Sequence, residues 1–194
     1  MTRRSLAIGA VVLLAIAGGW WLIARDRPSA SLPGPAGVPA AAGPAAPADA
    51  RKITATLYYV SEDGMSLAGV QRDVPFGEGV LEQARQIVTA QLGEAPAPLA
   101  SAIPKGVKLR GLFISSRGDA FVDLSVEARS LHPGGALDEL FTVYSIVNAL
   151  TTNLPAVTRV QLLIEGKEVD TLSGHVDLRH PLQRSLKWVQ TSEK

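Results

Sequence analysis

The sequence predicts an α+β domain in which two helices pack on one face of a single mixed or antiparallel sheet. Two observations predict this class. Short segments rich in β-branched and aromatic residues, bounded by turn residues, indicate strands. Two longer segments, near residues 79–92 and 135–153, carry apolar residues at helical spacing. Together these segments predict the order β-β-α-β-β-α-β-β within one domain, residues 51–183.

The first three elements are predicted to be a hairpin and a helix. Residues 53–60 (ITATLYYV) alternate between two faces and contain many β-branched and aromatic residues, which is typical of a strand. A turn at 61–64 leads to a short returning strand at 69–74, which ends before Pro75. The apolar stripe of the helix at 79–92 consists of Val80, Leu81, Ala84, Ile87, Val88 and Leu92.

A second hairpin and a longer helix follow. Residues 107–115 and 119–124 flank Ser116-Arg117-Gly118, which predicts two antiparallel strands joined by a turn. Pro133-Gly134-Gly135 opens a helix that runs to about Asn153. Its predicted apolar stripe consists of Leu137, Leu140, Phe141, Tyr144, Val147, Leu150 and Leu154.

The last elements of the domain are predicted to be strands. Pro155 ends the second helix, and residues 157–164 (VTRVQLLI) form the next strand. A tight turn at 165–167 leads to a short partner strand at 168–172. Residues 184–194 are predicted to be a C-terminal tail.

The N-terminus is predicted to be a membrane anchor, residues 1–24. Residues 6–24 (LAIGAVVLLAIAGGWWLIA) are uncharged, and at 1.5 Å per residue they extend about 28 Å, the thickness of a bilayer core. Arg3 and Arg4 precede this segment, which favours an orientation with the C-terminus outside the cytoplasm. A cleaved signal peptide is the alternative, although such apolar regions usually have about 7–15 residues.

Residues 25–50 are predicted to be a flexible tether. They are mostly Pro, Ala and Gly, with no aromatic residue, so they cannot bury enough surface to offset the entropy of ordering. An extended Pro-rich chain of this length reaches at most roughly 80 Å. The domain is therefore expected to sample space well beyond the bilayer surface.

Charge and cysteine content exclude several classes of function. Four of the 19 Lys and Arg residues and two of the 18 Asp and Glu residues lie in the first 50 positions, so residues 51–194 carry 15 basic and 16 acidic side chains. This net charge of −1 does not provide the excess of basic residues that is typical of a nucleic-acid-binding domain. The chain has no cysteine, which excludes disulfides, thiolate metal sites, thiol nucleophiles and lipidation at cysteine.

Five segments of the predicted domain resemble, in order and spacing, a known family. They are residues 101–109 (SAIPKGVKL), 120–125 (AFVDLS), 144–151 (YSIVNALT), 157–166 and 172–178 (LSGHVDL). The family is the GerMN domain of the GerM family of sporulation and spore germination proteins, and the resemblance covers about residues 53–182.

The resemblance implies an α+β domain similar to the ring-building modules of secretion and sporulation complexes. It implies assembly or scaffolding in the cell envelope rather than catalysis, and it transfers no catalytic residue. GerM itself resembles a tandem of two such domains on a lipoprotein, whereas this chain has one domain and no cysteine to lipidate. The chain is therefore interpreted as a membrane-anchored single-domain relative.

Three groups of polar residues invite a chemical interpretation. His175, Asp177 and His180 could be metal ligands, but residues five apart face opposite sides of a strand, so a polar loop is favoured. The other two groups are Asp123, Ser125, Ser145 and Asn148, as a possible acid or nucleophile set, and Lys105, Lys108 and Arg110, as a possible anion-binding cluster. For the possible acid or nucleophile set, hydrogen bonding to backbone groups is the favoured interpretation. For the basic cluster, a solvated strand face is favoured.

The predicted function is that of a non-enzymatic envelope protein whose domain mediates protein–protein assembly or scaffolding. Its partners are expected to be envelope proteins or a second copy of itself, with the membrane contacted by the N-terminal helix and no nucleic acid bound. No catalytic, cofactor-binding or metal-binding residue is assigned. A cell-wall glycan-binding module is the alternative, and an envelope hydrolase is the third.

The sequence also suggests where contacts could be made. Leu140, Tyr144 and Val147 are predicted to be core residues of the long helix. The candidate contact residues are Thr54, Thr56 and Tyr58 on the first strand, or Lys108 and Arg110 on the third.

Overall fold

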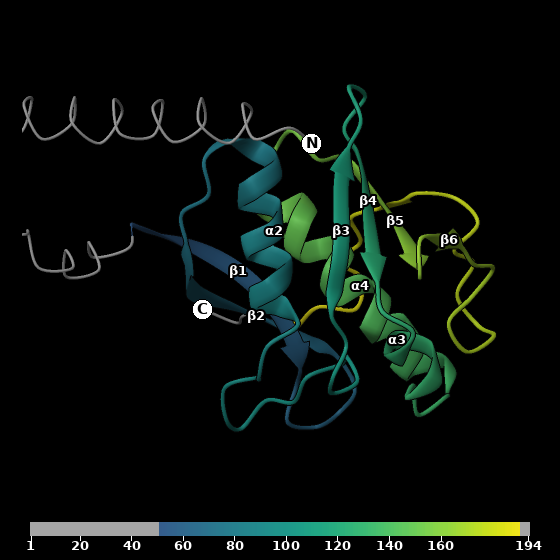
Figure 1. Cartoon of the computed structure of the whole chain (residues 1–194). Coiled ribbons are helices and arrows are strands. Elements are labelled where there is room, and N and C mark those ends of the chain that lie inside the picture. The colour runs from purple at the N-terminus through teal and green to yellow at the C-terminus, as the bar shows by residue number, and fades with distance from the viewer. Residues whose placement is uncertain (1–50, 191–194) are drawn as a thin grey trace, which may run out of the picture. The chain divides into compact units, whose positions relative to one another are not determined.

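The structure, a computed structural model, describes residues 51–190, in which two pairs of strands, each followed by helix, precede three further strands (Figure 1). The predicted anchor (1–24) and tether (25–50) lie outside this part. Within residues 51–190, no helix is long and apolar enough to cross a bilayer. In chain order the elements are β1 (Lys52–Val60), β2 (Leu67–Pro75), α2 (Gly79–Gln91), β3 (Leu109–Ile114), β4 (Asp119–Leu124), α3 (Glu127–Ser130), α4 (Ala136–Asn153), β5 (Arg159–Ile164), β6 (Lys167–Glu168) and β7 (Leu182–Gln183).

The predicted α+β class is confirmed, but the strands form two sheets rather than one. β1 and β2 form an antiparallel two-stranded sheet. The other sheet has the order β3-β4-β5-β6, and β7 also pairs with β5. β3 is antiparallel to β4, whereas β4 is parallel to β5, so the larger sheet is mixed. The connection between the parallel strands β4 and β5 contains α4, as a parallel pair requires.

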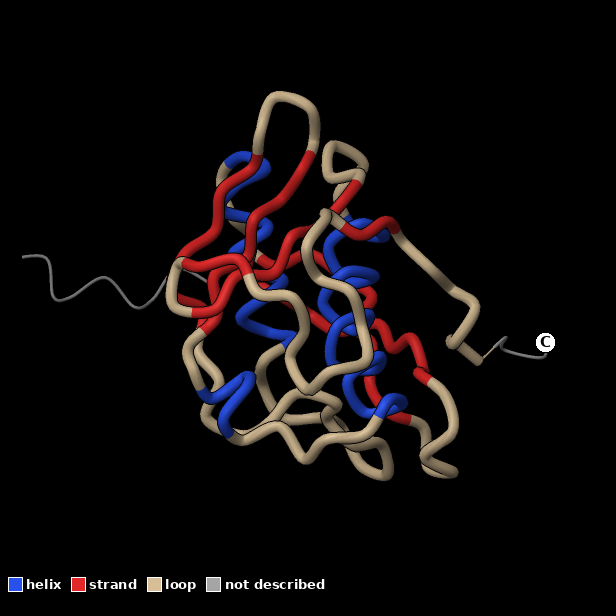
Figure 2. Tube along the Cα trace, turned by 90° about the vertical axis from the view of Figure 1, so that its right-hand side faces the viewer, coloured by secondary structure: helices blue, strands red, loops and turns tan. Residues whose placement is uncertain are grey.

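Both long helices pack against both sheets. α4 contacts β1 and β5, while α2 contacts β1, β2 and β3. Figure 1 accordingly shows the helices between the β1–β2 hairpin and the larger sheet. Figure 2 shows the same domain turned by 90°, with the loop between β3 and β4 projecting at the top in both views. The core therefore consists of two layers of side chains, one on each side of the helices.

The outer edge of β1 is closed by two side-chain amides and by the backbone of Ala100. The Asn153 side chain accepts from the Thr56 N–H at 2.8 Å and donates to the Thr56 carbonyl at 2.7 Å. Gln91 does the same for Tyr58, at 2.9 and 2.7 Å. Val60 exchanges backbone hydrogen bonds with Ala100 at 2.8 and 3.1 Å. These three partners satisfy alternate residues of the strand, as a neighbouring strand would.

Each strand of the larger sheet has one face toward the helices and one face away from them. Ala120, Val122 and Leu124 of β4 are fully buried, so Asp119, Phe121 and Asp123 lie on the opposite face. We call this opposite face the outer face.

The turn that joins β3 to β4 requires glycine. Gly118 has φ +83°, and a Cβ atom there would lie 2.7 Å from the Ala156 carbonyl. This turn matches the hairpin predicted from Ser116-Arg117-Gly118.

The buried face of α4 differs from the predicted stripe. Phe141, Val147 and Leu150 are buried as predicted, but Leu140 and Tyr144 are only half-buried. A narrow apolar stripe suits a helix with one covered face, whereas α4 is covered from two directions. Its buried face is therefore broad enough to include polar residues, namely Glu139, Thr142, Ser145 and Asn148.

Several smaller features also differ from the prediction. Val80 and Leu81, predicted in the apolar stripe of α2, are exposed in its first turn. The strand predicted at 168–172 is limited to Lys167–Glu168. The short helix α3 and the strand β7 were not predicted, because both have four residues or fewer and carry no periodicity. Backbone hydrogen bonds between Leu67 and residues 188–190 attach the C-terminal segment to β2.

Candidate functional site

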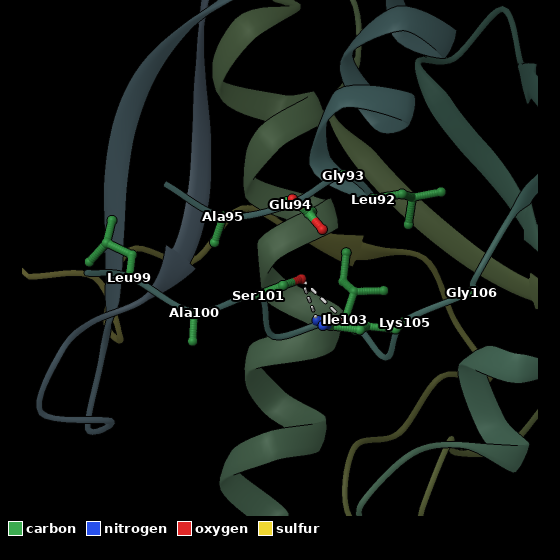
Figure 3. Close-up of a pocket in the computed structure, with 10 residues that line it drawn as sticks. All are labelled: Leu92, Gly93, Glu94, Ala95, Leu99, Ala100, Ser101, Ile103, Lys105 and Gly106. Atoms are coloured by element: carbon green, nitrogen blue, oxygen red, sulfur yellow. Dashed lines mark hydrogen bonds between the residues drawn. The ribbon is translucent and has the colours of Figure 1, made fainter. Parts of the chain in front are cut away.

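The loop between α2 and β3 lines a pocket of about 590 Å³ (Figure 3). Its wall is mostly backbone and apolar side chains, with Glu94, Ser101 and Lys105 as the polar members. The Ser101 hydroxyl donates to the Ile103 carbonyl and accepts from the Ile103 N–H, both at 3.2 Å. Ser101 is thus engaged with its own loop and has no His or carboxylate partner among the described residues to activate it as a nucleophile. This pocket supplies no catalytic set.

The predicted acid or nucleophile residues do not meet. Asp123, on the outer face, accepts from the Gly166 N–H at 2.7 Å, and Ser125 accepts from the Lys108 N–H at 2.9 Å. Asn148, buried on α4, exchanges two hydrogen bonds with the backbone of Ser185 at 2.8 and 3.0 Å. Ser145 donates to the Thr142 carbonyl one turn earlier in α4. Each of these residues therefore satisfies a backbone group, which is the interpretation that the sequence favours.

The C-terminal histidines form no metal site in the described residues. The Asp177 carboxylate instead pairs with the guanidinium of Arg179 at 2.7 Å. His175 belongs to a different cluster, centred on Glu139. The fully buried Glu139 carboxylate accepts from the backbone N–H groups of Leu172, Ser173 and His175 at 2.7 to 3.0 Å, and from the Ser173 hydroxyl at 2.9 Å.

These donors determine the charge state of Glu139. Burial by itself raises the pKa of a carboxyl group, but the hydrogen bonds from Ser173, His175 and Leu172 favour the ionised form. Their combined effect lowers the pKa of Glu139 to about 2 from its ordinary value of 4.5. Glu139 is therefore an anionic anchor that holds residues 172–175 against the first turn of α4.

The predicted basic cluster is divided among three environments. Lys105 lines the pocket, and the exposed Lys108 contacts Ser125 through its backbone, donating its N–H to the Ser125 hydroxyl and accepting the Ser125 N–H on its carbonyl. Arg110 is neutralised, because its guanidinium contacts Asp123 at 3.3 Å and also pairs with Glu165. The contact residues predicted on the first strand do not share one exposed surface either, since Tyr58 is buried and hydrogen-bonds to Thr152 at 2.9 Å. Neither set forms a continuous contact surface.

An aromatic pair, with the ring of Phe113 exposed and that of Phe121 half-buried, lies on the β3–β4 part of the outer face. Phe113 of β3 and Phe121 of β4 are directly opposite each other, with ring centroids 6.1 Å apart and planes tilted by 41°. Phe113, near the end of the edge strand β3, is 60% exposed, which is high for an aromatic residue. Beside Phe121, the buried Gln161 donates to the Leu178 carbonyl, so the loop after β6 closes that side of the face.

Charged clusters flank the aromatic pair at both ends of the strands. We call Arg117, Asp119 and Arg159 the hairpin-end cluster, in which the Asp119 carboxylate contacts Arg159 at 2.7 Å and Arg117 at 3.8 Å. We call Arg110, Asp123 and Glu165 the turn-end cluster. Two arginines and one aspartate give the first a formal charge of +1, whereas one arginine and two carboxylates give the second −1. The outer face is therefore apolar at its centre and oppositely charged at its two ends.

A family model matches residues 56–170, more than half of the chain, and its description is sporulation and spore germination. The chain belongs to the Germane family. This confirms the resemblance that the five sequence segments indicated.

Solved structures share the fold of this Germane domain. The first GerMN domain of the sporulation protein GerM from Bacillus subtilis has a TM-score of 0.52 at 21% identity, covering 70% of this chain and 98% of that one. The tandem GerMN domains of the same protein have a TM-score of 0.52 at 20% identity, covering 71% of this chain and 47% of that one. A predicted lipoprotein from Clostridium perfringens has a TM-score of 0.50 at 24% identity, covering 68% of this chain and 87% of that one. No curated protein is similar to this chain in sequence.

Sequence reasoning missed the two most distinctive features of this Germane domain. The sequence places Phe113 and Phe121 at equal distances from the centre of the turn, so their pairing across the hairpin could have been predicted from strand register. Glu139 could not have been identified in this way, because its donors lie more than 30 residues away.

Proposed function

We propose that this chain is a membrane-anchored envelope protein whose Germane domain binds another protein outside the cytoplasm. The observation that carries the proposal is the exposed Phe113 and its neighbour Phe121 between two charged clusters. Protein-binding surfaces typically combine a desolvated aromatic centre with a polar rim. Isolated exposed aromatic residues are common, but adjacent aromatic side chains on a sheet face are typical of an interaction site.

The anchor part of the proposal rests on the sequence. The uncharged segment 6–24 is long enough to span a bilayer, and the chain has no cysteine that could be lipidated. The predicted lipoprotein from C. perfringens supports a similar location for a domain of this fold. The intact mass of protein extracted from membranes should include residues 1–24. A mature N-terminus near Ser31 would contradict the anchor.

The glycan-binding alternative also needs an aromatic platform, and the Phe113–Phe121 pair is the candidate. Phenylalanine has no hydroxyl or indole N–H to hydrogen-bond a sugar, and the rings are tilted by 41° rather than coplanar. The surrounding charged groups already pair with one another. These features favour a protein partner over a glycan.

Chemical crosslinking of the full chain in its native membrane tests the proposal. Phe113→Glu should remove the crosslinked protein species without changing the thermal melt, because it places a charge at the apolar centre of the contact while the position itself is exposed. The control is Met65→Glu, because Met65 is 69% exposed in the β1–β2 turn, away from the outer face. If Phe113→Glu leaves protein crosslinks intact but abolishes retention on cell-wall glycan, the glycan alternative replaces this proposal.

A further inference from the structure

The outer face is electrostatically complementary to itself. The hairpin-end cluster and the turn-end cluster have opposite formal charges, and Phe121 lies midway between Asp119 and Asp123 on β4. At about 3.3 Å per residue, these two aspartates are about 13 Å apart along the strand. Glu168, which pairs with Leu163 in the register and therefore shares its face, adds a further carboxylate at the turn end.

Symmetry restricts how two such faces can meet. When two copies of one surface dock face to face, the two-fold axis must lie in the plane between them. An axis parallel to the strands would place each charged cluster against the same cluster of the second copy, so that like charges meet. An axis perpendicular to the strands, along the row that contains Phe113 and Phe121, reverses the strand direction in the second copy. The hairpin-end cluster of each copy then faces the turn-end cluster of the other.

We propose that the outer face binds the outer face of a second copy of this chain, with the two-fold axis perpendicular to the strands. The proposal deepens the proposed function, on which it rests, by naming the partner. Phe113 faces Phe113 of the second copy across the axis, and Phe121 faces Phe121 of the second copy. The aromatic rings bury each other at the centre, while opposite charges meet at both ends.

The size of the face predicts a weak, membrane-dependent association. The loop after β6 covers β5, so the free part of the outer face consists of β3 and β4. Two strands of six residues cover an area of about 200 Å² per copy, at about 4.8 Å between strands and 3.3 Å per residue. Stable interfaces bury about 800 Å² per partner. Attachment of both copies to one membrane raises their effective concentration and compensates for a small contact. The association should therefore be tested in the full, membrane-inserted chain.

The absence of cysteine makes the contact directly testable. Phe113→Cys introduces a unique thiol next to the two-fold axis, and Met65→Cys is the matched exposed control. Facing sheets are about 10 Å apart, so a short bis-maleimide can join the two thiols. We expect a crosslinked homodimer from Phe113→Cys and at most a trace from Met65→Cys. Equal yields from the two variants would overturn the proposal.

A charge-reversal pair tests the orientation. In the Phe113→Cys background, Arg117→Glu reverses the hairpin-end cluster to −1, and Glu165→Arg reverses the turn-end cluster to +1. Each variant alone should lower the homodimer yield by about fivefold or more, because like charges then meet at both ends. Mixed in one membrane, the two variants should form the heterodimer at the yield of the unreversed chain.

Three outcomes would overturn the inference, and they separate it from the proposed function. An undiminished homodimer yield from either charge-reversed variant alone excludes the perpendicular axis, provided that both variants keep the unreversed thermal melt. Crosslinks from the thiol introduced at position 113 to a different protein, without homodimer, overturn self-association and leave the proposed function standing. The absence of any crosslinked protein overturns both.

Discussion

The carboxylate of Glu139 is fully buried, and its Oε2 atom accepts the backbone N–H of His175 at 2.7 Å. This hydrogen bond joins the first turn of α4 to the loop that follows β6. The loop carries Leu172 and Leu178, which are both buried in the core. Glu139 therefore fixes a segment that has almost no regular secondary structure of its own.

Replacing Glu139 with Gln should destabilise the domain by about 1–3 kcal/mol. The amide nitrogen of the introduced glutamine would face N–H and O–H donors, so at least one donor loses its acceptor. Urea unfolding of the domain measures the change. Glu168→Gln, at an exposed position of β6, is the control and should stay within about 0.5 kcal/mol of the unsubstituted chain. Equal stability of the two variants would refute the role of Glu139 as an anchor.

The low pKa of Glu139 predicts a specific pH dependence. The folded-state pKa of about 2 is below the ordinary value of 4.5, so the folded state favours the ionised form. This contribution, about 3 kcal/mol, is fully present above pH 4.5 and is lost as the pH falls through 2. Urea midpoints measured from pH 6 to pH 2 should fall more steeply for the unsubstituted chain than for Glu139→Gln. Parallel curves would contradict the assignment.

Gln91→Met should open the edge of β1. Methionine keeps the size of the side chain but leaves the N–H and carbonyl of Tyr58 without partners in a buried position. Each unpaired group costs about 1–3 kcal/mol, so a loss of about 2–6 kcal/mol is expected in chemical denaturation. Gln86→Met on the same helix is the matched control, since Gln86 bonds only to Glu82 on the surface. A similar effect of both variants would show that the edge contact adds nothing.

The buried face of α4 can be tested by comparing adjacent residues. Phe141→Ala removes a fully buried ring and should cost about 3–5 kcal/mol. Leu140→Ala removes a half-buried side chain and should cost less than about 2 kcal/mol. Thermal or urea unfolding gives both values. The reverse order would support the stripe predicted from the sequence over the one in the structure.

The sequence predicted the local features of this domain well and the long-range ones poorly. Turn residues and periodicity located both hairpins and both long helices, because these signals act over a few residues. The closed edge of β1 depends on Gln91 and Asn153, whose partners on β1 are 33 and 97 residues away. No local pattern indicates which amide will close a strand edge. Glu139 could not be identified for the same reason, because acidic residues are common in the first turn of a helix and do not indicate distant partners.

The central claim is that the outer face makes the contacts of this protein, and site-specific photocrosslinking tests it most directly. A photoreactive phenylalanine analogue is placed at Phe113 in the full chain, irradiated in the native membrane, and compared with the same analogue at Met65. We expect a discrete protein adduct from position 113, most of it a homodimer, and none from position 65. Adducts from position 65 with none from position 113 would contradict the account.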